Sequence, residues 1–268
     1  MARPGQRRSP VIALALVVAL AVVVAAVWAF VLVDFRRAAA PDAAAAATAT
    51  GSTKGAAADE GAAGGAGKHA AKKTVKQARS ALAGEDPRVL VLGDSTGDGP
   101  DEWVRLWAQS EGLYVSNWQD GYYAGAGDET GLWNASMQDE ATADDAAEDW
   151  ETVRPESDPD VVLLNYGHYY DSGDEATESL ATLHEQLEED LPDAAVLVVL
   201  QNPEADDADA PVREAIGQWA KGAGLPTIDV AAAFEESDLP ADDLRLTDTQ
   251  PSEAGQELWV ETVQDRLG

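Results

Sequence analysis

Short apolar runs alternate with longer amphipathic segments from residue 88 to the C-terminus, and this alternation predicts one folded domain. Runs dominated by Val, Leu and Ile predict buried strands at 88–92, 113–118, 160–166, 194–201 and 225–230. Apolar residues that recur about every 3.6 positions predict helices at 101–111, 174–190, 208–222 and 252–266. A strand followed by a helix, repeated, is typical of a parallel sheet with helices on both faces. We therefore expect a three-layer α/β/α domain over residues 85–268, with a five-stranded parallel sheet.

The stretch from 121 to 159 does not follow this pattern. It is rich in Gly, Asp and Trp, and its apolar positions show no sustained period. We expect it to be partly helical and partly a loop over the top of the sheet.

The N-terminal part of the chain predicts a membrane anchor and a tether. Residues 11–33 are 23 consecutive residues without a charge, which is long enough for a transmembrane helix. Residues 1–10 would then be cytoplasmic and the folded domain extracytoplasmic; a signal peptide cleaved after Ala38-Ala39-Ala40 is the alternative. Residues 34–84 are mostly Ala, Gly, Thr and Lys, so we expect a disordered tether. Its portion 68–79 is compatible with a short basic helix, either a solvated spacer or a surface for an anionic envelope polymer.

The charge is divided unevenly between these parts. Residues 1–84 contain 11 Lys/Arg and 4 Asp/Glu, whereas residues 85–268 contain 7 Lys/Arg and 45 Asp/Glu. So acidic a domain repels phosphate backbones and anionic lipid surfaces, which argues against nucleic acid as a partner. The chain has no cysteine, so neither a disulfide nor a thiolate metal site is possible.

Candidate chemistry lies where the first predicted strand ends. Gly93-Asp94-Ser95 presents a serine hydroxyl, beside Asp94, at the carboxyl end of a strand, where open α/β sheets carry their active sites. Near the C-terminus, Gln250-Pro251-Ser252 precedes a predicted helix. A third polar segment, Gly167-His168-Tyr169, follows the strand at 160–166.

Together these three segments resemble the conserved blocks of the SGNH (GDSL-type) hydrolases. The resemblance extends over about 88–266 and implies a flavodoxin-like sheet with strand order 2-1-3-4-5. It also implies that Ser95 is the nucleophile and that Gly121 or Gly125 gives a backbone N–H to the oxyanion, with Gly167 in the third block. Two family residues are replaced: Gln250 stands at the position of the catalytic histidine, and Tyr169 stands at the position of the asparagine that donates to the oxyanion.

The replacement of the histidine leaves the proton acceptor open, because a glutamine amide cannot take up a proton. Asp248 is two residues before Gln250 rather than the three of the family spacing, and a shift of one residue could bring its carboxylate to Ser95. His168, at the end of the third strand, is the second candidate base. The third alternative is that no reaction takes place.

Two functions are therefore open. The first is a membrane-anchored esterase that acts with Ser95 on acyl or acetyl esters of envelope glycans or lipids. The second is an inactive SGNH-like module that binds an envelope polymer or a protein. We expect no cofactor and no metal, since the calcium-loop-like start at Asp94 has Arg105 at its twelfth position.

Overall fold

The computed structural model describes residues 60–125, 127, 130–137 and 140–268. The predicted anchor at 11–33, the segment 1–10 and tether residues 34–59 lie outside the described residues. Within the described ranges, no helix is both long and apolar enough to cross a membrane. The described residues belong to one compact unit, Ala58–Gly268.

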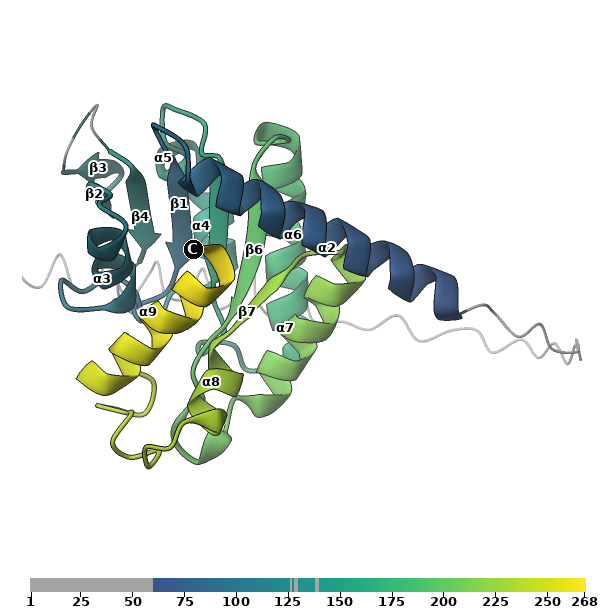
Figure 1. Ribbon diagram of the computed structural model, residues 1–268, viewed down its shortest axis with the longest axis vertical. Helices are drawn as coiled ribbons and strands as arrows, with labels where there is room; N and C mark the ends of the chain where they lie inside the picture. The colour runs from purple at the N-terminus through teal and green to yellow at the C-terminus, as the bar shows by residue number, and fades with distance from the viewer. Residues whose placement is uncertain (1–59, 126, 128–129, 138–139) are drawn as a thin grey trace, which may run out of the picture. The chain divides into compact units, whose positions relative to one another are not determined.

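A seven-stranded sheet forms the centre of this unit (Figure 1). Its strands are β1 (Val89–Gly93), β2 (Val115–Gln119), β3 (Tyr122–Ala124), β4 (Leu132–Ser136), β5 (Val161–Asn165), β6 (Ala195–Leu200) and β7 (Thr227–Asp229). They lie in the order β3-β2-β4-β1-β5-β6-β7, and all neighbours are parallel except β2 and β3. The five predicted strands are present in the expected relative order, but the prediction of a five-stranded, purely parallel sheet is wrong.

The two additional strands come from the stretch that we expected to be irregular. β4 lies between β2 and β1, and its polar residues Asn134 and Ser136 interrupt the apolar pattern that would have identified it. β3 pairs with β2 through a turn at Asp120 and Gly121, whose φ angles are 48° and 91°. A turn with two positive φ angles fits the right-handed twist of a hairpin, and Asp-Gly is a favoured pair for it.

Helices cover both faces of the sheet. The four predicted helices are present as α3 (Trp103–Ser110), α6 (Gly173–Asp190), α7 (Ala210–Ala223) and α9 (Glu253–Leu267). Shorter helices add to them: α4 (Ala143–Glu148), α5 (Trp150–Val153), α8 (Val230–Glu236) and the 3-10 turn η2 (Ala205–Asp207).

The strands alternate between two apolar layers. Leu90 and Leu92 of β1 pack in the layer that includes α4, α5, α6 and α7, whereas Val89 and Val91 pack in the layer that includes α3, α8 and α9. Successive side chains of a strand point to opposite faces, so a strand buried on both faces reads as a continuous apolar run. The three-layer α/β/α prediction is confirmed.

The tether prediction needs correction from residue 60 onward. Residues of α2 (Glu60–Leu82) form a helix, which crosses the sheet on the same side as α9 in Figure 1. Its Ala78 is fully buried, and Arg79 donates to the backbone oxygens of Asp265 and Arg266 at the end of α9. The alanine-rich composition suggested disorder, but alanine also favours helices, and small side chains let α2 lie close to the domain.

Candidate active site

Ser95 lies in a tight loop where β1 ends. A side chain at Gly93 would place its Cβ 2.9 Å from the backbone oxygen of Asn165 in the neighbouring strand β5. A side chain at Gly97 would lie 2.7 Å from Ser136 Oγ. Glycine is therefore required on both sides of Ser95, because β1 turns between two adjacent strands there.

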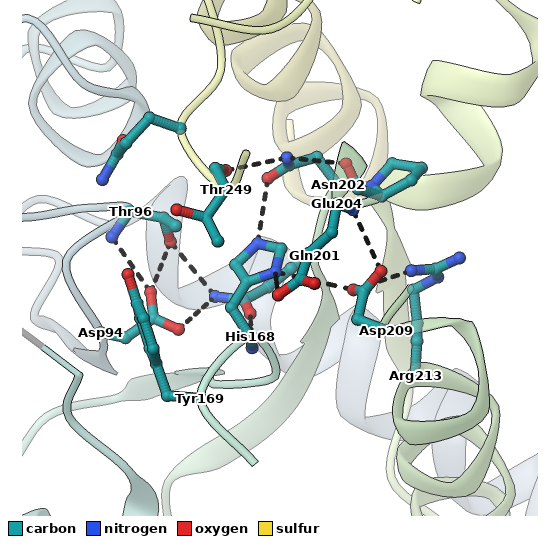
Figure 2. A network of polar contacts seen from close by, with 12 residues as sticks. Asp94, Thr96, His168, Tyr169, Gln201, Asn202, Glu204, Asp209, Arg213 and Thr249 are labelled. Atoms are coloured by element: carbon teal, nitrogen blue, oxygen red, sulfur yellow. Dashed lines mark hydrogen bonds and ion pairs between the residues drawn. The ribbon is translucent and has the colours of Figure 1, made fainter. Parts of the chain in front are cut away.

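Asp94 is the buried side chain that holds this loop in place by hydrogen bonds. Its Oδ1 accepts hydrogen bonds from the backbone N–H of Thr96, at 3.0 Å, and from Thr96 Oγ1, at 2.7 Å. Its Oδ2 accepts from Gln201 Nε2 at 2.9 Å (Figure 2). Burial raises the pKa of Asp94, while nearby His168 and the bonds from Thr96 and Gln201 oppose that rise. The carboxylate thus holds the loop shape and points away from solvent.

Gln201 connects Asp94 to the third block. It follows β6, is 2% exposed, and its Oε1 accepts the backbone N–H of His168 at 3.0 Å. A Cβ at Gly167 would lie 2.7 Å from the same Oε1, so Gly167 leaves room for this bond. Gln201 was not among the site residues predicted from the sequence. The signal was present, since Gln201-Asn202 ends a predicted buried strand just as Asp94-Ser95 does.

His168 is buried away from Ser95. Its Nδ1 lies 3.6 Å from carboxylate oxygens of both Glu204 and Asp209, and its Nε2 faces Asn202 Oδ1 at 3.4 Å (Figure 2). Burial alone lowers the pKa of His168, but the contact with Glu204 and the charges of Asp94 and Asp209 outweigh it, so the pKa is raised. Both ring nitrogens are thus directed at other groups, and none of these contacts reaches Ser95.

Asn202 links the hydrogen bonds of His168 to the loop that contains Gln250. Its Nδ2 donates to the backbone oxygen of Thr249 at 3.0 Å, and Thr249 precedes Gln250. The buried histidine therefore supports, through Asn202, the loop that brings the C-terminal segment to the site.

The outer face of the site brings together Ser95, Tyr169 and Gln250. Ser95 Oγ lies 2.8 Å from the Tyr169 hydroxyl, and Gln250 Nε2 donates to the backbone oxygen of Ser95 at 2.7 Å. The expected meeting of Ser95 with Gln250 is therefore found. Asp248 is exposed, and the contact recorded for it is made by its backbone oxygen, which accepts from the N–H of Ala205.

The packing of α3 against α9 holds the two ends of the domain together at this point. The rings of Trp103 and Trp259 are stacked with centroids 5.4 Å apart, and Gln256 Oε1 accepts the backbone N–H of Trp103 at 2.8 Å. Ser252 caps α9, because its side chain accepts from the backbone N–H of Gly255. Since α3 follows the Ser95 loop and α9 follows Gln250, this packing sets the distance between them.

The two glycines that we proposed as oxyanion donors lie elsewhere. Gly121 is in the exposed turn between β2 and β3, and Gly125 lies beside Val115, at the start of β2, on the opposite edge of the sheet from Ser95. Because β4, not β2, is the neighbour of β1, neither glycine lies in the segment next to the end of β1. The segment beside the end of β1 begins at Ser136 and Met137, and Met137 donates its N–H to the Gly93 oxygen at 2.9 Å.

One more carboxylate, Glu102, which the sequence pattern did not indicate, shares a cleft with Gln250. Glu102 and Gln250 line one cleft of about 1000 Å³, and Glu102 Oε2 accepts the backbone N–H of Gly99 at 2.7 Å. Burial raises the pKa of Glu102 to about 7. A carboxyl group that titrates near neutral pH is suited to proton exchange, although Glu102 accepts its hydrogen bond from Gly99 of the loop and not from Ser95.

A parallel α/β/α sheet with a serine after its first strand, and a C-terminal loop returning to that serine, defines the class of the SGNH hydrolases. Residues 91–258 match the GDSL-like Lipase/Acylhydrolase family, and the chain belongs to that family. A comparison with curated proteins found no match.

Solved structures share the fold at low sequence identity. A putative lipolytic protein of the G-D-S-L family from Desulfitobacterium hafniense is 16% identical with a TM-score of 0.52, covering 67% of this chain and 99% of that one. A catalytic mutant of the acetylxylan esterase Axe2 from Geobacillus stearothermophilus is 18% identical with a TM-score of 0.51, covering 69% and 95%. A carbohydrate esterase family 3 protein from Talaromyces cellulolyticus is 20% identical with a TM-score of 0.50, covering 68% and 96%.

Proposed function

We propose that this GDSL-family domain is a slow esterase in which Ser95 is the nucleophile and the Tyr169 hydroxyl is a donor to the oxyanion. The observation that carries the proposal is the 2.8 Å contact between Ser95 Oγ and the Tyr169 hydroxyl. Two structural relatives, an acetylxylan esterase and a carbohydrate esterase, support an acyl or acetyl ester as substrate. We extend this to esters of envelope glycans or lipids.

Tyr169 suits the role of the missing asparagine. When Ser95 Oγ bonds to the carbonyl carbon of an ester, the electron pair of the C=O bond moves to the carbonyl oxygen, which lies next to Oγ. A phenol hydroxyl within hydrogen-bond distance of Oγ can donate to that oxygen. The proton of Ser95 passes to solvent water, because Gln250 cannot accept it. The C=O bond then re-forms as the alcohol leaves with a proton from water, and a second water molecule hydrolyses the acyl-Ser95 ester to the acid and free Ser95. The absence of an imidazole base makes the reaction slow, because the loss of one member of the triad costs several orders of magnitude in rate.

The test is the hydrolysis of an aryl acetate by the purified full chain and three variants. We expect Ser95→Ala to abolish the turnover, Tyr169→Phe to lower kcat about 10²-fold, and Tyr169→Asn to keep most of the activity. An asparagine amide donates a hydrogen bond but accepts no proton. If Tyr169→Asn retains its esterase activity, Tyr169 therefore acts as a donor to the oxyanion and not as a base. Tyr122→Phe, at an exposed tyrosine of β3, is the matched control. Equal turnover by the wild type and Ser95→Ala would overturn the esterase proposal.

A binding module without turnover is the second candidate function. One observation favours it: Gln250 stands at the family position of the catalytic base, and its Nε2 donates to the Ser95 backbone oxygen. Gln250 therefore fixes the loop and does not take up a proton. Two clefts of about 940 and 1000 Å³ are both lined by Pro100, five residues after Ser95, and offer space for a polymer or a peptide. Binding of an acetylated glycan that is unchanged by Ser95→Ala, with no ester cleaved by either protein, would favour this candidate.

We also propose that residues 11–33 anchor the chain in a membrane, with the domain on the extracytoplasmic side. The support is the run of 23 uncharged residues together with Arg3, Arg7 and Arg8 ahead of it. The full chain should then fractionate with membranes, whereas a mature N-terminus near Ala40 or Pro41 would indicate a cleaved signal peptide.

A further inference from the structure

Helix α2 differs in charge from the rest of the domain. Residues 61–84 contain no Asp or Glu, although residues 85–268 contain 45. The same helix carries Lys68, Lys72, Lys73, Lys76 and Arg79. Positive charge is thus gathered on one helix of a strongly negative domain.

The lysines share one side of α2. A helix turns by about 100° per residue, so positions 68, 72, 73 and 76 lie within one broad face. All four are exposed. The adjoining side packs on the domain through Val75, Ala78 and Leu82. The bonds of Arg79 to the end of α9, and of Gln77 Nε2 to the Asp193 oxygen, fix this orientation.

The basic face is not neutralised within the domain. Four arginines elsewhere form ion pairs with carboxylates: Arg88, Arg154, Arg213 and Arg245. Within the described part of the chain, the four lysines of α2 take part in no ion pair, although acidic residues greatly outnumber basic ones. The positive charge of α2 therefore remains available to a partner.

We propose that the basic face of α2, made by Lys68, Lys72, Lys73 and Lys76, docks on an anionic lipid surface. A lipid surface fits because the same chain contains the uncharged run at 11–33, ahead of α2. Lysines near an anionic membrane are attracted to it, and the effect falls off within a Debye length of about 8 Å at physiological ionic strength. Carboxylates farther from the membrane than this length are screened, so only acidic residues beside α2, such as Asp193 and Asp265, oppose the contact. The proposal is independent of the ester chemistry.

The experiment measures the rate at which each lysine of the full chain is acetylated, by mass spectrometry, with vesicles present. Phosphatidylcholine vesicles are compared with vesicles that also contain phosphatidylglycerol, so only the headgroup charge changes. We expect acetylation of the four lysines to be about fivefold slower with the anionic vesicles and to recover at high salt. A reporter lysine in the variant Tyr122→Lys, on the edge strand β3, should be acetylated at the same rate with both.

Charge variants give a second readout that does not depend on lysine chemistry. Amide hydrogen exchange in α2 should slow with anionic vesicles in the wild type and when all four lysines are replaced Lys→Arg, but not when all four are replaced Lys→Gln. Equal acetylation and exchange rates with both kinds of vesicle would overturn the proposal. Equal protection by soluble polyphosphate would overturn it too, in favour of an anionic polymer.

Discussion

The inner and outer halves of the site differ in how completely their polar groups are bonded. The inner half, Asp94, Thr96 and Gln201, is buried, and each side chain takes part in two or more hydrogen bonds. The outer half, Ser95, Tyr169 and Gln250, is partly exposed and is joined by the Ser95–Tyr169 contact and the bond from Gln250. The inner half holds the loop in shape, whereas the outer half determines what the loop can do chemically. The buried half of the site is therefore complete although the outer half carries Gln250, whose amide cannot take up a proton.

Breaking the inner half should have the largest effect. Gln201→Leu removes the donor to Asp94 Oδ2 and the acceptor for the His168 N–H, which leaves a buried carboxylate without one of its partners. We expect the free energy of unfolding to fall by about 3 kcal/mol. Urea denaturation measures it, with Gln218→Leu on the exposed side of α7 as the control. A loss no larger than that of the control would mean that the network does not stabilise the fold.

Restoring a base in the outer half should change activity more than stability. Gln250→His places an imidazole next to the Ser95 loop, and we expect aryl acetate turnover to rise about tenfold. The gain is smaller than for a complete triad, because exposed Asp248 is one residue off the position that would orient the ring. Gln119→His, in the exposed end of β2, is the control for hydrolysis by a surface histidine that is not positioned next to Ser95. A rise of similar size in the control, or none in Gln250→His, would argue against a competent Ser95.

The smallest expected effect is the pH dependence of the Tm that Glu102 contributes. Glu102 lines the same cleft as Gln250 of the outer half. Its pKa is raised from 4.5 to about 7, so the folded state binds a proton more tightly than the unfolded state does. Its contribution to stability is therefore full below about pH 4.5 and is lost as the pH rises through about 7. We expect the Tm of the wild type to fall, relative to Glu102→Gln, between pH 5 and pH 7.5. Parallel Tm curves for the two proteins would show that Glu102 does not titrate in this range.

The sequence was sufficient for the elements that bury apolar residues with a clear period. All five predicted strands and all four predicted helices are present, and Ser95 meets Gln250 because parallel strands and the last helix converge on one edge. β4 was missed because Asn134 serves the loop, donating to the Gly97 oxygen at 2.8 Å, and not the apolar core. Without β4, the sequence placed Gly121 and Gly125 next to the end of β1, where the structure has Ser136 and Met137.

The partners of buried polar side chains could not be predicted from the sequence. The position of His168 at the end of a strand was predictable, but whether its ring faces Ser95 or Glu204 and Asp209 depends on residues that follow β6, far away in the chain. The same holds for α2, whose alanine-rich pattern alone does not reveal that the end of α9 accepts hydrogen bonds from Arg79. Such contacts arise from packing between segments that are distant in the sequence, and local periodicity does not predict them.

The two outer strands of the sheet, β3 and β7, are each only three residues long. A strand of this length presents few free backbone N–H and C=O groups, so an extended segment of another molecule finds little to pair with. Sheets from separate molecules therefore cannot readily join edge to edge into fibrillar aggregates. Together with the mutual repulsion of acidic surfaces, this should keep the domain dispersed in concentrated solution, which light scattering can measure.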